Sequence, residues 1–197
     1  MAERLSGARV VITRPEGQLE PLCERLRTLG AEPIKFPVIA VADPIPGGDL
    51  DRAINHLTDY DWIIFTSVNG VEHFWARLAS VLGKGVTRTG GIPNFGGKIA
   101  AIGPATAAAL AQHRIGVHLV PGEYRAEAIL EAIGDVDGSR ILLPRADIAR
   151  ADLAHGLRER GAHVDEVPAY RTVPATPPPE AFEELGRGVD IIAFTSS

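Results

Sequence analysis

The stretch VPAYRTVP at residues 167–174 decides how this chain is organised, and it has an earlier echo in FPVIAV at residues 36–41. Each stretch follows a helical pattern that closes with Gly-Ala. The flanking prolines remove backbone donors and favour extended conformations, so neither stretch suits the centre of a sheet. We interpret the two stretches as paired strands that cross between two lobes.

A long internal repeat surrounds these crossing strands. RVVITR at residues 9–14 lines up with RILLPR at residues 140–145, and the Gly and Pro positions that follow keep the same register. DWIIFTS at residues 61–67 similarly matches DIIAFTS at residues 190–196. Unrelated β-α-β units also share apolar strands, but agreement of register, Gly and Pro together favours a true repeat.

Buried-strand patterns alternate with helical spacing along the chain, which is typical of parallel sheets flanked by helices. We therefore predict an α/β fold with two similar lobes joined by a two-stranded antiparallel linker. Strands are predicted at residues 9–13, 62–65, 98–102, 117–120, 140–143 and 190–194, and a largely helical segment at 145–160. Cys23 falls on the apolar side of the predicted helix that begins near Leu19.

The second copy of the repeat stops soon after its Thr-Ser, whereas the first copy continues through a further helix and two strands. The terminal lobe is therefore expected to be truncated. With 197 residues, a net charge of −5, a single cysteine and no apolar membrane span, the chain is expected to be cytoplasmic. The negative charge also argues against a general nucleic-acid binder.

Three loops that follow strands and open helices are candidates for binding an anion: residues 66–70, 103–106 and 121–125. Ligands of open α/β sheets bind at the carboxyl ends of strands, where helix N-termini present free N–H groups. Thr66, Ser67, Gly103 and Thr106 are the candidates there, and a fourth loop contributes Thr195 and Ser196. The alternative is that the hydroxyl groups only cap their helices.

Arg14 and Arg145 occupy equivalent places after the first strand of each repeat. Each arginine is either a solvated loop residue or a partner for substrate carboxylates in a cleft. Tyr170 is the only residue of the crossing stretches with an acidic proton. It is either a packed strand tyrosine or a general acid. The six histidines show neither metal-ligand spacing nor a nucleophilic triad, so no metal site is predicted.

Taken in chain order, several of these motifs resemble the uroporphyrinogen-III synthase family, the cofactor-free cyclases of tetrapyrrole biosynthesis. Each motif is short, but the series covers the whole sequence in family order. The motifs are VITRP at 11–15, LGA at 29–31, FPVI at 36–39, IFTSVNGV at 64–71, AIGPATA at 101–107 and VPAYRT at 167–172.

The resemblance implies a two-lobed protein whose internal lobe comprises residues 38–169 and whose terminal lobe comprises 1–37 and 170–197. It implies that the substrate is hydroxymethylbilane, a linear tetrapyrrole with eight carboxylates. The family expels hydroxide, inverts ring D and closes the macrocycle without a cofactor. Tyr170 aligns with a tyrosine that assists hydroxide loss, and Thr66, Ser67 and Thr106 align with cleft-lining hydroxyl residues.

We therefore expect a monomeric uroporphyrinogen-III synthase, a lyase, that binds a small molecule and neither membrane nor nucleic acid. The alternative is a non-catalytic ligand-sensing domain of the same fold. Such a domain could be fused beyond Ser197 to a DNA-binding module. A generic two-lobed small-molecule binder is a third reading, supported by fold analogy alone.

Overall fold

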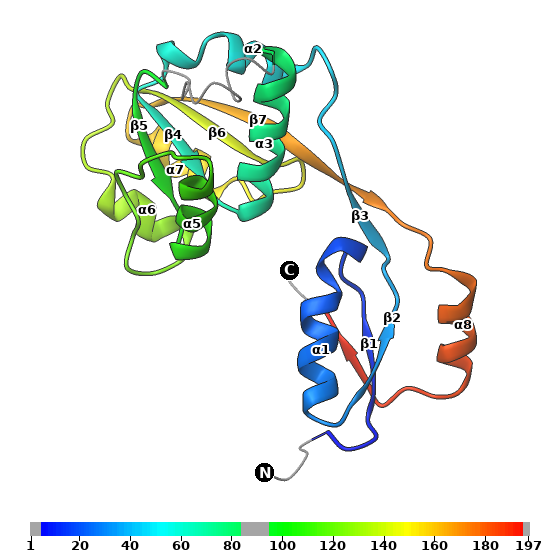
Figure 1. Ribbon diagram of the computed structural model, residues 1–197. Coiled ribbons are helices and arrows are strands. Elements are labelled where there is room, and N and C mark those ends of the chain that lie inside the picture. The colour runs from blue at the N-terminus through cyan, green and yellow to red at the C-terminus, as the bar shows by residue number, and fades with distance from the viewer. Residues whose placement is uncertain (1–4, 84–94, 195–197) are drawn as a thin grey trace. The chain divides into compact units, whose positions relative to one another are not determined.

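The computed structural model describes residues 5–83 and 95–194 (Figure 1). Contacts divide the chain into two compact units. Unit 1 comprises Met1–Ala42 and Thr172–Ser197, and unit 2 comprises Asp43–Arg171. The chain passes into unit 2 after strand β3 (Ile39–Ala42) and returns along β7 (His163–Pro174). We describe each unit by itself.

Unit 1 contains a three-stranded parallel sheet with the order β2-β1-β8. Figure 1 shows helices α1 and α8 on opposite sides of this sheet. Cys23 on α1 is fully buried against Ile12 of β1, as the helical spacing predicts. The elements are β1 (Arg9–Ile12), a 3-10 turn (Glu16–Gln18), α1 (Glu20–Thr28), β2 (Glu32–Lys35), α8 (Pro179–Gly186) and β8 (Ile191–Ala193).

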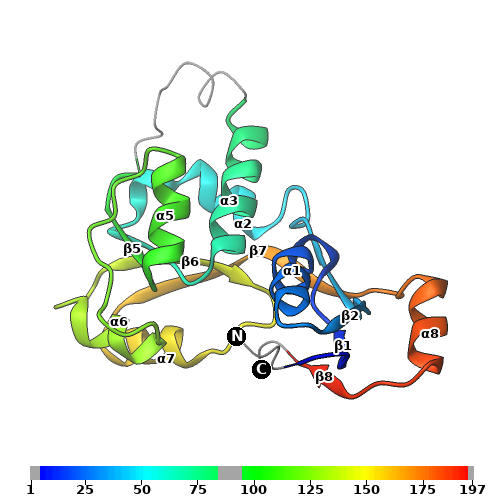
Figure 2. The same cartoon turned by 60° about the horizontal axis from the view of Figure 1, so that its bottom comes forward.

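Unit 2 carries most of a five-stranded sheet with the order β3-β7-β6-β4-β5. Figure 2 shows α3 and α5 on one face of this sheet and α6 and α7 on the other. The remaining elements are α2 (Asp49–Asn55), a 3-10 turn (Leu57–Asp59), β4 (Trp62–Phe65), α3 (Val68–Val81), β5 (Lys98–Ala101), α5 (Pro104–Gln112), α6 (Ala126–Ala132), β6 (Arg140–Ala146) and α7 (Asp152–Glu159).

Strand registers confirm the repeat. Arg9 pairs with Glu32 in unit 1, and Arg140 pairs with His163 in unit 2, so both partners of the second pair stand 131 residues further on. The strand on the other side of each pair is also parallel, β8 beside β1 and β4 beside β6. The two units therefore share one β-α-β core and one neighbouring strand.

Three details of the predicted elements are wrong. Residues 145–151 are not helical, because β6 continues through Ala146 and α7 begins only at Asp152. Residues 117–120 form no named strand, only an isolated bridge between Ala100 and Leu119. Residues 32–35, which were not predicted as a strand, form β2.

The proline argument for the second crossing stretch also needs correction, because β7 has a neighbour on each side in the strand order. The N–H of His163 donates to Ser139 O at 2.8 Å, so alternate residues from His163 onward face β6. Pro168 has the opposite parity, and its missing donor therefore costs no bond to β6. Immediately after the pair Arg145–Pro168 the register shifts, so that Ala146 pairs with Tyr170.

A polar network around the buried Tyr60 joins the entrance of β4 to β7 in unit 2. The Tyr60 hydroxyl donates to Asp165 Oδ2 at 2.8 Å, and the Arg140 guanidinium lies 5.1 Å from the centre of the Tyr60 ring. Arg140 also pairs with Asp165 at 3.3 Å. Burial, and then the bond to Asp165, raises the pKa of the Tyr60 phenol.

Tyr60→Phe is expected to lower the free energy of unfolding by about 1–2 kcal/mol, because it removes a buried hydrogen bond. Since the phenol pKa is raised in the folded state, its contribution is complete below the unfolded pKa of about 10 and declines as pH rises further. Urea unfolding followed by tryptophan fluorescence measures this, because Trp62 and Trp75 both belong to unit 2.

The variant should therefore lose less stability than the wild type between pH 9 and pH 11. An unchanged midpoint at pH 7 together with an unchanged alkaline slope would show that the network contributes nothing to stability.

Candidate active site at the carboxyl ends of the strands

The four parallel strands of unit 2 end at one edge of the sheet, and most of the predicted site residues gather there. The N–H of Ile102, after β5, donates to Phe65 O at the end of β4, at 2.9 Å. On the other side, the N–H of Asp147 donates to Tyr170 O at 3.2 Å. The loops that follow β4 and β5 therefore share this edge with the ends of β6 and β7.

The loop after β4 turns directly into helix α3. Ser67 is the N-cap residue, and its Oγ accepts a hydrogen bond from the Gly70 N–H at 2.9 Å. A Cβ on Gly70 would lie 3.2 Å from Pro144 O, so α3 starts in close contact with β6. Ser67 thus caps α3, which is the alternative to anion binding that the sequence left open. Thr66 is half-buried beside it.

The loop after β5 leads into α5 without a side-chain cap. Gly103 is the N-cap residue and Pro104 opens the first turn. Thr106 is only 4% exposed, so its side chain packs inside the protein. A Cβ on Gly103 would lie 3.0 Å from the Tyr124 ring, whose residue is 66% exposed. The predicted loop 121–125 thus brings an aromatic ring to this edge, which sequence reasoning did not single out.

Arg145 lies at the end of β6 but is 8% exposed and fully engaged within unit 2. One Nη donates to Arg150 O at 2.6 Å, and the other pairs closely with Glu166. Glu166 is also bound by Arg158 Nη1 at 2.7 Å. This arginine therefore holds together the loop after β6, the strand β7 and the end of α7.

Arg14 follows β1 in unit 1, where it is half-buried. Within residues 5–83 and 95–194 it makes no hydrogen bond or ion pair, in contrast to the equivalent Arg145. Thr195 and Ser196, the fourth predicted loop, lie outside the described residues.

Tyr170 is half-buried near the end of β7 and packs against the larger apolar core of unit 2. The ring of His73, from α3, lies 5.5 Å from the Tyr170 ring, centroid to centroid, with a tilt of 31°. From the sequence, no role is predicted for His73, because the histidines show neither metal-ligand spacing nor a nucleophilic triad. No local signal could have found it, because its partners are distant in the chain.

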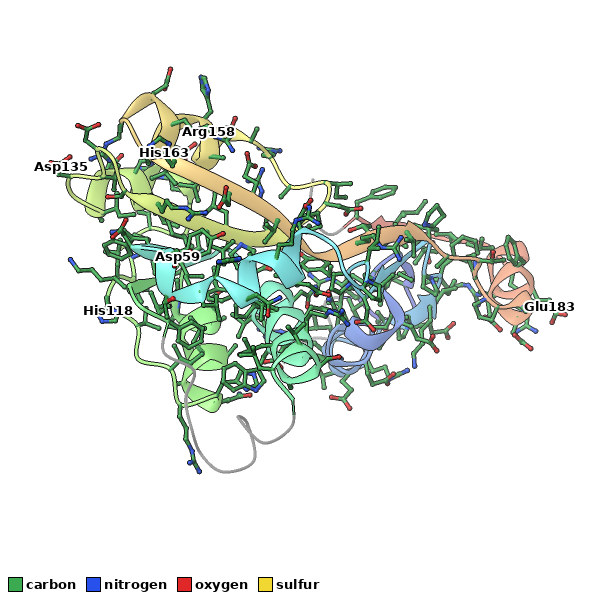
Figure 3. All side chains as sticks on the ribbon, turned by 90° about the horizontal axis from the view of Figure 1, so that it is seen from above. Asp59, His118, Asp135, Arg158, His163 and Glu183 are labelled. Atoms are coloured by element: carbon green, nitrogen blue, oxygen red, sulfur yellow. The ribbon has the colours of Figure 1, made fainter. Side chains whose placement is uncertain are left out.

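A second polar region lies at the opposite end of the strands. A cavity of about 700 Å³ there is lined by α2 and by the first residues of β6 and β7, among them Arg52, Arg140 and Asp165. Figure 3 labels Asp59, on the α2 side, and Arg158, on the α7 side. Arg52, Arg140 and Arg158 each pair with a carboxylate, so this cavity has no uncommitted arginine for an anionic ligand.

The part of the chain that the structure describes contains neither a cluster of metal ligands nor a membrane-spanning helix. No three His, Cys, Asp or Glu side chains there are placed to share a metal ion. No helix there has the length and apolar character needed to cross a membrane.

The fold and this edge define a class: α/β proteins that repeat one β-α-β core in two units, with helix N-termini and a strand tyrosine at one sheet edge. The sequence model described as "Uroporphyrinogen-III synthase HemD" matches residues 20–197. The chain belongs to the uroporphyrinogen-III synthase family.

Individual relatives agree with this assignment. The chain is 34% identical over 202 residues to a uroporphyrinogen-III synthase of Synechococcus elongatus, covering 100% of this chain and 74% of the relative. It is 30% identical to a putative uroporphyrinogen-III synthase of Methanothermobacter thermautotrophicus, covering 95% and 73%. The crystal structure of a mutant uroporphyrinogen III synthase from the extremely thermophilic bacterium Thermus thermophilus matches with a TM-score of 0.66 and 25% identity, covering 94% and 71%.

Arg145→Ala is expected to lower the free energy of unfolding by about 3 kcal/mol, because it removes a buried cation and strips partners from main-chain carbonyls. Arg125→Ala is the matched control, since Arg125 pairs with three glutamates on an exposed surface. Urea unfolding followed by tryptophan fluorescence should show a large shift for Arg145→Ala and none for Arg125→Ala. Equal midpoints for the two variants would contradict the structural role of Arg145.

Proposed function

We propose that this chain is itself a uroporphyrinogen-III synthase, a cyclising hydro-lyase that converts hydroxymethylbilane to uroporphyrinogen III with inversion of ring D. The observation that carries the proposal is family membership, with a match that runs from residue 20 to residue 197. The edge of the sheet in unit 2 supports the proposal in chemical terms, as set out below. The same membership supports a place in porphyrin and heme biosynthesis.

The substrate is a chain of four pyrroles with carboxylate side chains, so the site must hold anions without trapping the product. The starts of α3 and α5 present main-chain N–H groups toward the edge, and helix N-termini favour negative charge. Gly103 is buried beneath the Tyr124 ring, and the exposed Tyr124 side chain offers an apolar face to a pyrrole. Thr66 and Ser67 are proposed to line the substrate site in this way, and the buried Gly103 and Thr106 are proposed to shape the loop behind it.

Little acid–base machinery is needed, because the pyrrole nitrogens supply the electrons that expel the hydroxyl group. The required protein contribution is a donor for the departing oxygen and control of the geometry of ring closure. Tyr170 is proposed as that donor. Within the described residues its hydroxyl makes no hydrogen bond, so the proton is available to a substrate oxygen.

The arginines divide by their surroundings. Arg14 is proposed to meet a substrate carboxylate, since no described residue neutralises it. Arg145 is proposed to support the substrate site indirectly, by fixing the loop after β6. Thr195 and Ser196 are proposed to contribute hydroxyl groups to the site. We further propose that the protein works in the cytoplasm as a monomer, requires no cofactor and binds no nucleic acid.

The direct test incubates the protein with hydroxymethylbilane generated enzymatically in the same vessel. Uncatalysed closure gives only the type-I isomer, so formation of the type-III isomer above a protein-free control supports the proposal. Type-I product alone would overturn it and would favour a ligand-sensing domain of the same fold.

Tyr170→Phe is expected to lower kcat about 100-fold, since general acid catalysis typically contributes 10²–10⁴-fold. KM should change little, because the ring remains in place. Phenylalanine also keeps the packing against the unit 2 core, so the urea midpoint should match that of the wild type. An unchanged kcat would reduce Tyr170 to a packing residue.

A further inference from the structure

Four residues of unit 2 form a closed ring of contacts around Tyr170. Arg171 Nε donates to the main-chain oxygen of Asp43 at 3.2 Å, and Asp43 Oδ1 lies 3.1 Å from His73 Nδ1. The His73 ring packs on the Tyr170 ring, and Tyr170 is bonded to Arg171. We propose that the Asp43–His73 pair is a positioning device for the Tyr170 phenol, an inference that rests on the proposed function.

The device joins three separate segments. Asp43 is the first residue of unit 2 and Arg171 is the last, so the ring of contacts ties the entry of the chain to its exit. His73 comes from the second turn of α3, a helix whose start is fixed by the Ser67 cap at the end of β4. Contact with His73 therefore fixes the position of Tyr170 relative to the sheet edge where the substrate is proposed to bind.

His73 is held in one orientation by its surroundings. Its side chain is 24% exposed, so the ring lies largely against protein, and its Nδ1 lies beside the Asp43 carboxylate, whose side chain is 85% exposed. Arg77, one turn further along α3, lines a cavity of about 200 Å³ together with His73 and Asp43.

Arg77 does not compete for Asp43, because it forms a two-pronged pair with Asp51. This pair lowers the pKa of the Asp51 carboxyl, chiefly through the bond from Arg77. The Asp43 carboxylate is left to His73. The arrangement accordingly assigns one carboxylate to each basic side chain of this helix face.

The consequence concerns the orientation of the phenol. Tyr170 is only half-buried, and without the imidazole its ring would lose the partner that restricts its rotation. Proton donation depends on a hydroxyl placed within hydrogen-bond reach of the departing oxygen, so a loosened ring lowers turnover more than it lowers binding. His73 is thus a positioning residue, which acts through Tyr170 and not on the substrate.

The chain offers a matched control in the same unit. The His113 ring stacks on Trp75 at 4.5 Å with a tilt of 27°, and its Nε2 lies 3.3 Å from Glu72. Its side chain is 19% exposed, close to the value for His73. His113→Ala therefore removes the same kinds of contact from unit 2 without touching Tyr170.

The test is a double-mutant cycle measured on the isomer-forming assay. His73→Ala should lower kcat about 10-fold with KM changed less than about 2-fold, since displacement of a catalytic group costs up to about 100-fold. In a Tyr170→Phe background the same change should cost less than about 2-fold, because its target is gone. His73→Phe keeps a ring against Tyr170 but cannot pair with Asp43, so it should restore only part of the lost turnover.

Equal losses in the two backgrounds, a loss of the same size from His113→Ala, or full rescue by His73→Phe would overturn the proposal. A readout independent of activity separates it from the proposed function. Carbon-13 NMR of labelled tyrosines should show a shifted Tyr170 ring signal in His73→Ala and an unshifted one in His113→Ala. If the wild type made only type-I product, the synthase proposal would fail while this signal would still report the contact.

Discussion

The parallel pairing of β6 with β4 on one side and β7 on the other is the constraint on which unit 2 depends. Ile141, Leu142 and Leu143 at its centre are fully buried, so the strand contributes side chains to both faces of the core. Parallel neighbours require helical crossovers, and those crossovers bring every strand end to the same edge. The register of β6 therefore determines which loops and side chains meet there.

The same pairing places two arginines at opposite ends of one strand, an exposed Arg140 and a buried Arg145. Near its start, Arg140 supports Tyr60 and Asp165 beneath α2. At its end, Arg145 ties β7 to the loop that precedes α7. The first arginine lies at the end of the sheet away from the candidate site, and the second fixes the loop after β6 at the end that carries the candidate site. Both arginines are therefore paired with carboxylates inside unit 2. On this account, anion binding depends on main-chain N–H groups at the starts of the helices.

Much of this was predictable from the sequence, because the signals were local or repeated. The repeat gave the two similar units, the β4 limits agree with its apolar run, and helical spacing placed Cys23 in a core. Prolines misled the interpretation of β7, since a proline is compatible with a strand where its missing donor faces away from a partner. The sequence alone could not show which way those donors face.

The polar partners could not be predicted for a different reason. Arg145 is held by Glu166 and His73 by Asp43, and each pair joins segments that only the fold brings together. An arginine after a strand is equally consistent with substrate binding and with a buried ion pair, so burial decides between them. The role of Tyr124 depended in the same way on its approach to Gly103, which sequence spacing does not encode.

The central claim is that ligand binds at the carboxyl ends of the strands and not in the large polar cavity at their other end. Amide hydrogen exchange of the whole chain, resolved by NMR with and without uroporphyrinogen III under anaerobic conditions, tests it directly. The account predicts slower exchange at residues 67–70, 103, 105–107 and 170–171, where the first turns of α3 and α5 and the tyrosine meet the ligand. Slower exchange confined to residues 49–60 and 163–167 would contradict it.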